Sequence, residues 1–221
     1  MNQYHKLYTP ADTAIVFIDQ QPQMTFGVAS ADRATLINNT TLLARVAKEF
    51  NVPTVLTAVE TESFSGYIWP QLLDIFPGQQ VVERSSMNSW DDAGFRKAIE
   101  ATGRKNILMT GLWTEVCITC PTIEMLGAGY NIYVVEDCCG ATSPATQEAA
   151  LSRMVQAARP YCHHSSCAPR LRGRVSGGAA RIFPNFFRAQ RRVGSKHAHA
   201  AARFGLPRIR HSAHVRQRDG A

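Results

Sequence analysis

Residues 106–128 read NILMTGLWTEVCITCPTIEMLGA, an apolar run that passes through a short polar turn into a helical pattern. The first seven residues have the length and composition of a buried strand, and residues 115–128 have the apolar spacing of a helix that ends near Gly127 and Gly129. A strand followed directly by a helix is the repeating unit of parallel α/β sheets. This stretch therefore predicts the fold class of the chain.

The same unit recurs through the first two thirds of the sequence. The further predicted strands are Thr13–Asp19, Thr54–Val59, Gln80–Val82 and Asn131–Glu136, and the further predicted helices are residues 34–50, Tyr67–Phe76, Asp91–Ala101 and Ser143–Ala157. Because right-handed crossovers place helices on both faces of such a sheet, this order predicts an α/β protein. We expect a Rossmann-like, three-layer α/β/α domain with a mostly parallel sheet over residues 8–158.

Residues 159–221 differ from the rest of the chain in composition and have no helical or strand period. Residues 1–157 carry 10 basic and 16 acidic side chains, whereas residues 158–221 carry 14 basic side chains and one acidic one. The net charge of +7 therefore hides an acidic domain and a strongly basic segment. Three explanations stay open for an irregular, arginine-rich segment: a sequence read from GC-rich DNA in a shifted frame, a disordered tail, or a basic tail that binds nucleic acid.

The location of the protein follows from its apolar segments and cysteines. The longest apolar run lies within residues 13–18, too short to span a membrane, and the first ten residues lack the apolar core of a signal peptide. Six cysteines in a chain of this length are typical of reduced thiols and not of a disulfide scaffold. We therefore expect a cytoplasmic protein with no membrane partner.

Three chemically capable side chains stand at predicted strand ends: Asp19, Arg84 and Cys117. Ligands of parallel sheets bind beyond the carboxyl ends of the strands, so these residues are the candidate catalytic site. Thr114 as a helix cap would place Cys117 in a first turn, where free N–H groups favour a thiolate and can hold an oxyanion. Asp19 can exchange a proton with Cys117, and Arg84 can keep Asp19 ionised. A packed cysteine, a capping aspartate and a surface arginine are the structural alternatives.

Other chemistries have weaker signals. Cys117 and Cys120 form a C-x-x-C motif, the pattern of thiol–disulfide oxidoreductases, although Pro121 follows the second cysteine instead of lying between the two. His5 is the one histidine before residue 158, so no metal site is expected there, and the cluster Cys162–Cys167 matches no established zinc spacing. Neither glycine-rich phosphate-binding motif occurs, so no cofactor is expected.

Three motifs, taken in order, resemble those of the isochorismatase-like cysteine hydrolases and, among them, the YcaC-related subgroup. They are DQQ at residues 19–21, RSSMNSW at 84–90 and GLWTEVC at 111–117, and the resemblance covers about residues 8–157. The family implies an Asp–Lys–Cys triad, with Asp19 as general acid/base and Cys117 as nucleophile. Arg84 stands where most of the family has lysine.

The resemblance implies a cofactor-independent hydrolase that acts on an amide-like C–N bond of a small molecule and assembles as a homo-oligomer. The substrate-binding residues expected from their positions are Asn88, Trp90, Trp113 and Thr114. The family also implies a cis peptide between Trp113 and Thr114, and a last strand and helix that this chain replaces with its arginine-rich segment. A non-catalytic product whose basic tail binds nucleic acid and a C-x-x-C oxidoreductase are the alternative functions.

Overall fold

The computed structural model describes residues 8–158 and 172–173, and its core is a single parallel sheet. The strands, in the spatial order β3-β2-β1-β4-β5-β6, are β3 (Val81–Arg84), β2 (Thr54–Val59), β1 (Thr13–Ile18), β4 (Asn106–Leu112), β5 (Asn131–Gly140) and β6 (Arg172–Gly173). All five pairings are parallel. The order changes direction between β1 and β4, as in doubly wound sheets, so the predicted fold class is confirmed.

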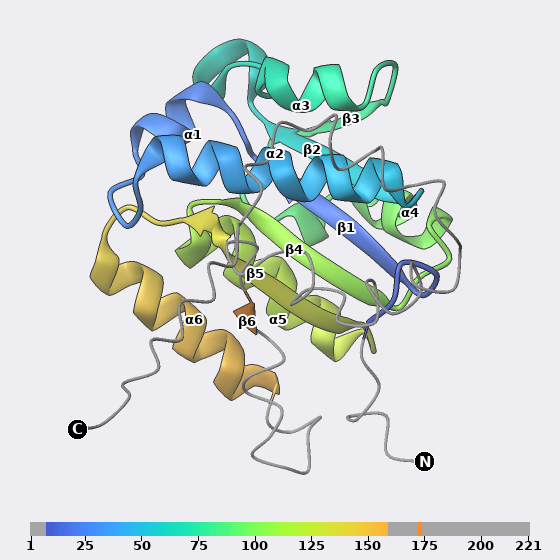
Figure 1. The fold of residues 1–221 in the computed structure, drawn as a ribbon. Helices are drawn as coiled ribbons and strands as arrows, with labels where there is room; N and C mark the ends of the chain where they lie inside the picture. Colours follow the sequence, from blue (N-terminus) through green and yellow to red (C-terminus); the bar gives the residue numbers. More distant parts are fainter. Residues whose placement is uncertain (1–7, 159–171, 174–221) are drawn as a thin grey trace, which may run out of the picture. The chain divides into compact units, whose positions relative to one another are not determined.

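Helices cover both faces of this sheet. They are α1 (Pro22–Phe26), α2 (Arg33–Glu49), α3 (Pro70–Ile75), α4 (Ala93–Ala101), α5 (Thr119–Gly127) and α6 (Pro144–Ala158), with the short turns η2 (Thr61–Ser65), η3 (Ser89–Asp91) and η4 (Thr114–Ile118). Figure 1 shows α2 crossing in front of the sheet and α4 and α5 behind it. Every residue of β1 is buried, as a strand covered on both faces requires.

Local sequence explains where the longer helices begin. The carboxylates of Asp32 and Asp92 accept backbone N–H groups at the starts of α2 and α4. Ser143 accepts the N–H of Thr146 at 3.1 Å, and Pro144 is the first residue of α6, as the Ser-Pro pair predicted. Each cap satisfies an N–H group that has no acceptor within its helix.

Two predicted strands are longer in the structure. β3 extends through Arg84, which is its last residue and not the residue after it. β5 continues to Gly140, because a register shift in its pairing with β4 lets Cys139 pair with Gly111 beyond the charged pair at 136–137. From the sequence alone, the two charged residues predict that the strand ends at Glu136. The cysteines at 138 and 139 therefore lie in a strand and are buried.

The segment after β2 also differs from its prediction. Only Pro70–Ile75 of the predicted helix Tyr67–Phe76 is helical, because proline favours a first helical position and the preceding chain turns at Gly66, whose φ is 77°. The short helix α1 was not predicted, since it has five residues and no complete apolar period.

Within the segment predicted to be irregular, Arg172–Gly173 forms β6 beside Val134 and Val135 of β5. The outer edge of β5 thus has a two-residue neighbour. The predicted boundary between 8–158 and 159–221 stays a prediction, and Cys162–Cys167 lies outside the described residues. No helix in the described part of the chain is both long and apolar enough to cross a membrane.

Candidate active site

The carboxyl ends of β1, β3 and β4 bring Asp19, Arg84 and Cys117 together. Nη2 of Arg84 donates to both carboxylate oxygens of Asp19, at 2.6 and 2.7 Å. The Cys117 thiol donates to the same carboxylate. All three residues are buried, and Asp19 and Cys117 are 0% exposed. The structure therefore forms one contiguous group from three residues separated by up to 98 positions in the chain.

Backbone conformation sets the direction of these side chains. Asp19 follows β1 with φ 59° and Trp113 follows β4 with φ 52°, and both values lie in the left-handed region. Asp19 is held there by its N–H, which donates to the carbonyl of Thr57 at 3.0 Å. Left-handed conformations of residues other than glycine cost about 1–3 kcal/mol each and persist where the surroundings enforce them, which is common at functional sites.

The guanidinium of Arg84 is fixed on two sides. Nη1 donates to the backbone carbonyl of Ser86, while Nη2 contacts Asp19. Its Nε atom is buried and has no hydrogen-bond partner among the described residues. Because a guanidinium stays protonated at all ordinary pH values, this side chain is a permanent cation aimed at Asp19.

Burial controls the protonation of Asp19. Removal from water raises the pKa of Asp19, and the charge and hydrogen bonds of Arg84 oppose that increase without cancelling it. A carboxylate with a raised pKa is a stronger base than an exposed one. Asp19 is therefore better suited to accept a proton and return it than an exposed aspartate is.

The pKa of Cys117 is raised, which is opposite to the expectation that its position in a helical turn favours a thiolate. Burial and then the negative charge of Asp19 raise the pKa of Cys117 far above its ordinary value, against a smaller lowering by Arg84. A helix N-terminus lowers a thiol pKa only where desolvation and a nearby carboxylate do not exceed it. Any nucleophilic attack by Cys117 must therefore include proton transfer to Asp19.

The turn that carries Cys117 is π-helical and begins one residue before the predicted helix. The predicted helix 115–128 begins as the π-helical turn η4, and the N–H groups of Val116 and Cys117 both donate to the carbonyl of Trp113 at 2.9 Å. The first N–H groups of a helix, here those of Thr114 and Glu115, have no acceptor within it. These two groups are the candidates for holding an oxyanion.

Thr114 does not cap this turn. Its hydroxyl is buried and makes no hydrogen bond among the described residues. The expected cis peptide between Trp113 and Thr114 is also absent, since every peptide bond of residues 8–158 and 172–173 is trans. The left-handed φ of Trp113 turns the chain there instead.

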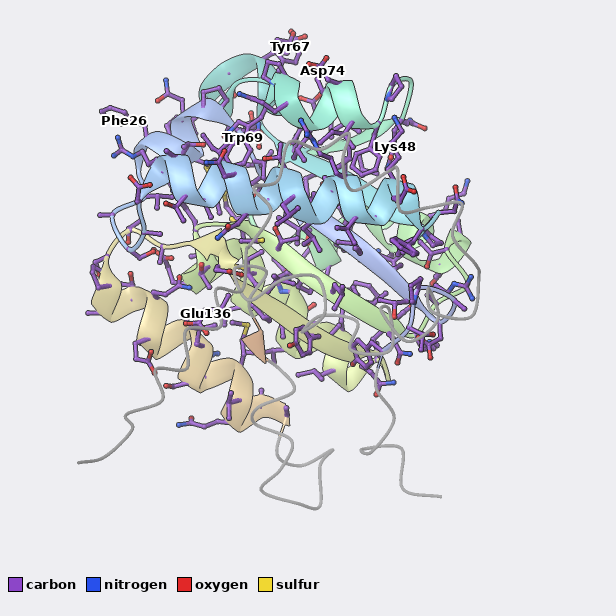
Figure 2. All side chains as sticks on the ribbon, viewed as in Figure 1. Phe26, Lys48, Tyr67, Trp69, Asp74 and Glu136 are labelled. Atoms are coloured by element: carbon purple, nitrogen blue, oxygen red, sulfur yellow. The ribbon has the colours of Figure 1, made fainter. Side chains whose placement is uncertain are left out.

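Trp113 is wedged between α1 and η2 next to this turn. Its Nε1 donates to the carbonyl of Met24 at 3.2 Å, and its ring meets Phe64 edge-on with centroids 6.3 Å apart. Figure 2 shows Phe26, on α1, and Tyr67, just after η2, directed outward, and both side chains are exposed. Phe64 is thus an aromatic neighbour of Trp113 beside the turn that carries Cys117.

Asn88 and Trp90 lie elsewhere. Asn88 caps η3 and donates to Glu124 at 3.1 Å. Trp90 packs edge-on against Phe95 and Tyr130, and Tyr130 immediately precedes β5 at the amino end of the sheet. These partners thus lie on α4, on α5 and just before β5, and the role of the two residues in substrate binding stays a prediction.

Gln20 and Gln21 belong to the site but received no role from the sequence alone. Both are 0% exposed and follow Asp19 directly. The available signal was two amide side chains between a buried strand and a proline, where surface residues are usual. As for metals, no group of three or more metal-binding side chains occurs in the part of the chain that the structure describes.

Comparison with known proteins defines the family. The model of the isochorismatase domain matches residues 13–165. The chain belongs to the isochorismatase family. A relative in this family, probable hydrolase YcaC of Escherichia coli (strain K12), is 33% identical over 147 residues, which are 66% of this chain and 71% of the relative.

Solved structures of isochorismatase-family proteins agree with this assignment. YcaC from Pseudomonas aeruginosa, solved with hexane-2,5-diol and covalent acrylamide, has a TM-score of 0.74 and 28% identity, covering 84% of this chain and 86% of that protein. YcaC from E. coli, described as an octameric hydrolase of unknown specificity, has the same score and identity, covering 84% and 85%. The predicted resemblance and fold are confirmed, and the chain is a hydrolase.

Proposed function

We propose that this protein hydrolyses an amide-like C–N bond of a small molecule, with Cys117 as nucleophile and Asp19 as general acid/base. The observation that carries the proposal is the carboxylate of Asp19, which is buried and bonded at the same time to a fixed cation, Arg84, and to the thiol of Cys117. A nucleophile beside a base that is itself oriented by a third group is the general arrangement of covalent catalysis.

The reaction follows from the protonation states. Asp19 accepts the Cys117 proton as Sγ bonds to the substrate carbonyl carbon, and the oxygen becomes an oxyanion near the N–H groups of Thr114 and Glu115. As the C–N bond breaks, Asp19 gives its proton to the leaving nitrogen. Water then attacks the thioester, again with Asp19 as the base, and releases a carboxylic acid and the free thiol.

Arg84 has an electrostatic role in this scheme. It cannot give up a proton at neutral pH, so Asp19 carries every proton in the cycle. Its two hydrogen bonds keep the carboxylate oriented toward Cys117 and stabilise its ionised form. No step requires a cofactor.

Properties of the relatives support a reactive small-molecule site and a homo-oligomer. The P. aeruginosa relative was solved with covalent acrylamide, a small amide that alkylates nucleophiles such as thiols. The E. coli relative is described as octameric. We infer that this chain also assembles with copies of itself.

The test is a pair of cysteine variants. Cys117→Ala should abolish turnover of a panel of small amides and remove acrylamide labelling at position 117, which fragmentation in the mass spectrometer distinguishes from labelling at Cys120, Cys138 and Cys139 of the same peptide. Cys120→Ala is the matched control, because it lies three residues away in the same helical segment and is partly exposed. Full turnover by Cys117→Ala would overturn the mechanism, and loss of activity in both variants would favour the C-x-x-C alternative.

A further inference from the structure

The side chain of Gln21 makes three hydrogen bonds to the backbone of other segments. Its Oε1 accepts from the N–H of Val59 at 2.9 Å, and its Nε2 donates to the carbonyl of Val59 at 2.9 Å and to that of Gly66. Gln21 lies beyond the end of β1, yet its amide pairs with both backbone groups of Val59 as a neighbouring strand would. The sheet is thus continued by a side chain past the point where β1 ends.

Val59 connects Gln21 to the residue that holds Asp19. On its other side, Val59 pairs with Arg84, and the carbonyl of Arg84 accepts the N–H of Glu60 at 3.0 Å. The N–H of Gln21 donates to the carbonyl of Asp19 at 2.7 Å. Hydrogen bonds therefore join Asp19 to Gln21, Gln21 to Val59, and the next residue, Glu60, to Arg84, and the ion pair between Arg84 and Asp19 closes the ring.

The same amide also holds the segment beside Trp113. Gly66, whose carbonyl accepts from Gln21, has a φ of 77° and ends η2. Phe64, in η2, packs against the ring of Trp113. One buried side chain thus connects the backbone around Asp19, the neighbour of Arg84 and the loop that contacts the residue before η4.

We propose that Gln21 is a positioning residue, whose amide holds Asp19 in register with Arg84 for proton transfer from Cys117. This inference rests on the proposed function. Loss of the amide would let β1 and β2 separate beyond Thr57, and the two hydrogen bonds between Arg84 and Asp19 depend on that spacing. Gln21 itself touches no reacting atom.

Gln79 supplies a matched control at the other end of β2. Its Nε2 donates to the carbonyl of Thr54 at 2.7 Å, and its Oε1 accepts from the Thr54 hydroxyl at 2.9 Å. It is the same residue type, bonded to the same strand, but at the amino edge of the sheet. A purely structural role for Gln21 predicts that the two residues behave alike.

The experiment compares Gln21→Met and Gln79→Met in the full chain. Acrylamide alkylation of Cys117 is followed from pH 5 to 10 by peptide mass spectrometry, and thermal unfolding is recorded in parallel. Gln21→Met should slow alkylation by about tenfold or more, since small displacements of reacting groups have effects of this size. The alkylation rate should fall at acidic pH as Asp19 becomes protonated. In Gln21→Met this acid limb of the pH profile should move to higher pH, because an Asp19 carboxyl less tightly paired with Arg84 binds its proton more strongly.

Gln79→Met should lose stability but keep the alkylation rate and the position of the acid limb. Gln21→Glu is the second variant: it keeps the shape and the acceptor for Val59, loses both donated bonds when ionised, and should show the same shift. Where Gln21→Met does not fold, Gln21→Glu decides by the same criterion. Equal destabilisation of the Gln21 and Gln79 variants with an unchanged pH profile would overturn the proposal.

Failure of the proposed function looks different. If Cys117 of the unmodified protein reacts no faster than the buried Cys138 and Cys139, the nucleophile assignment fails and the role of Gln21 fails with it. If Cys117 reacts selectively and the Gln21 variants match the parent, only the role of Gln21 is overturned.

Discussion

Both edges of the sheet have turns that pass through left-handed residues, but the residue types differ between the two edges. At the amino edge, four connections between a helix and the next strand pass through left-handed residues: Asn51, Gly78, Gly103 and Gly129. Glycine and asparagine adopt this conformation at little cost, and both are typical just after a helix. At the carboxyl edge, the left-handed residues that directly follow strands are Asp19, Glu60 and Trp113, for which it is costly.

Polar groups show the same contrast. The amino edge pairs Asn131 with Asn106 at 2.9 Å and places the ammonium of Lys105 over the ring of Tyr130 at 4.0 Å. The carboxyl edge instead buries the Asp19–Arg84 ion pair. Buried polar atoms without a described partner occur near both edges, for example the hydroxyl of Thr114 and Nε of Arg104. The amino edge thus turns at residues that adopt the left-handed conformation at little cost, whereas the carboxyl edge contains left-handed residues for which it is costly and a buried ion pair.

Breaking the buried ion pair should have the largest effect on stability. Arg84→Met leaves the Asp19 carboxylate buried without its cation, and such losses cost about 3–5 kcal/mol. Because the pKa of Asp19 is raised in the folded state, the folded chain binds the proton more tightly and stability falls as pH rises. Without Arg84 that pKa rises further, so urea unfolding should show a larger deficit at pH 8 than at pH 5.

Asp19→Asn is the control for this change. Added to Arg84→Met, it removes the unpaired charge and should restore part of the lost stability and abolish the extra pH dependence. A single variant Arg84→Met that unfolds like the parent at both pH values would contradict the contrast between the two edges.

Alkaline pH should destabilise the carboxyl edge through its buried thiols. Burial raises the pKa of Cys139 from 9.0 to about 12. Between these values the unfolded chain releases a proton that the folded chain retains, so stability falls by about 1.4 kcal/mol per pH unit for this thiol. Cys139→Ala should give a smaller decrease in unfolding free energy between pH 8.5 and 10.5 than the parent shows.

The decrease in Cys139→Ala should not vanish, because burial also raises the pKa of Cys138. Cys120→Ala, which removes a partly exposed thiol, should change the slope less than Cys139→Ala. If the free energy of unfolding depended on pH in the same way in the parent and both variants, burial would not be what keeps Cys139 protonated.

Exchanging turn residues between the edges should have opposite effects of about 1 kcal/mol. Gly103→Ala has open space around the new methyl group, yet it forces alanine to a φ of 64°, so stability should fall. Glu60→Gly relieves a residue at φ 47° and should raise stability. Thermal unfolding measures both, and a stabilising Gly103→Ala would refute the comparison.

The smallest effect is expected at Asn51. Asparagine already tolerates φ 51°, so Asn51→Gly should change the free energy of unfolding by less than about 0.5 kcal/mol. A loss above 1 kcal/mol would mean that the side chain of Asn51 does more than form a turn.

Much of the fold could be predicted from the pattern of apolar residues. The limits of β2 and β4 match their predictions, because a continuous apolar run between turn residues is a local signal. β5 could not be delimited in this way, since its pairing with β4 continues past two charged residues through a register shift. A register shift depends on the neighbouring strand and leaves no local pattern.

Some residues of the candidate site could likewise be predicted from the sequence, whereas others could not. Asp19, Arg84 and Cys117 could be proposed because each stands where a predicted strand ends, and Arg84 also begins the motif at residues 84–90. Asn88 and Trp90 belong to that motif, but the partners named above lie on α4, on α5 and just before β5. Position in a motif indicates proximity along the chain, and a single turn changes which part of the fold a side chain meets.

The sequence by itself determined the parallel sheet, the strand ends that carry Asp19 and Cys117, and the family to which they point, because hydrophobic patterning and motif spacing are properties of neighbouring residues. The tertiary structure alone decided that burial and Asp19 raise the pKa of Cys117, that Asp19 and Arg84 form a buried pair, and that the side chain of Gln21 joins the ends of β1 and β2. Burial, charge and hydrogen bonding act between groups far apart in the chain, and only the order of the strands brings those groups into contact.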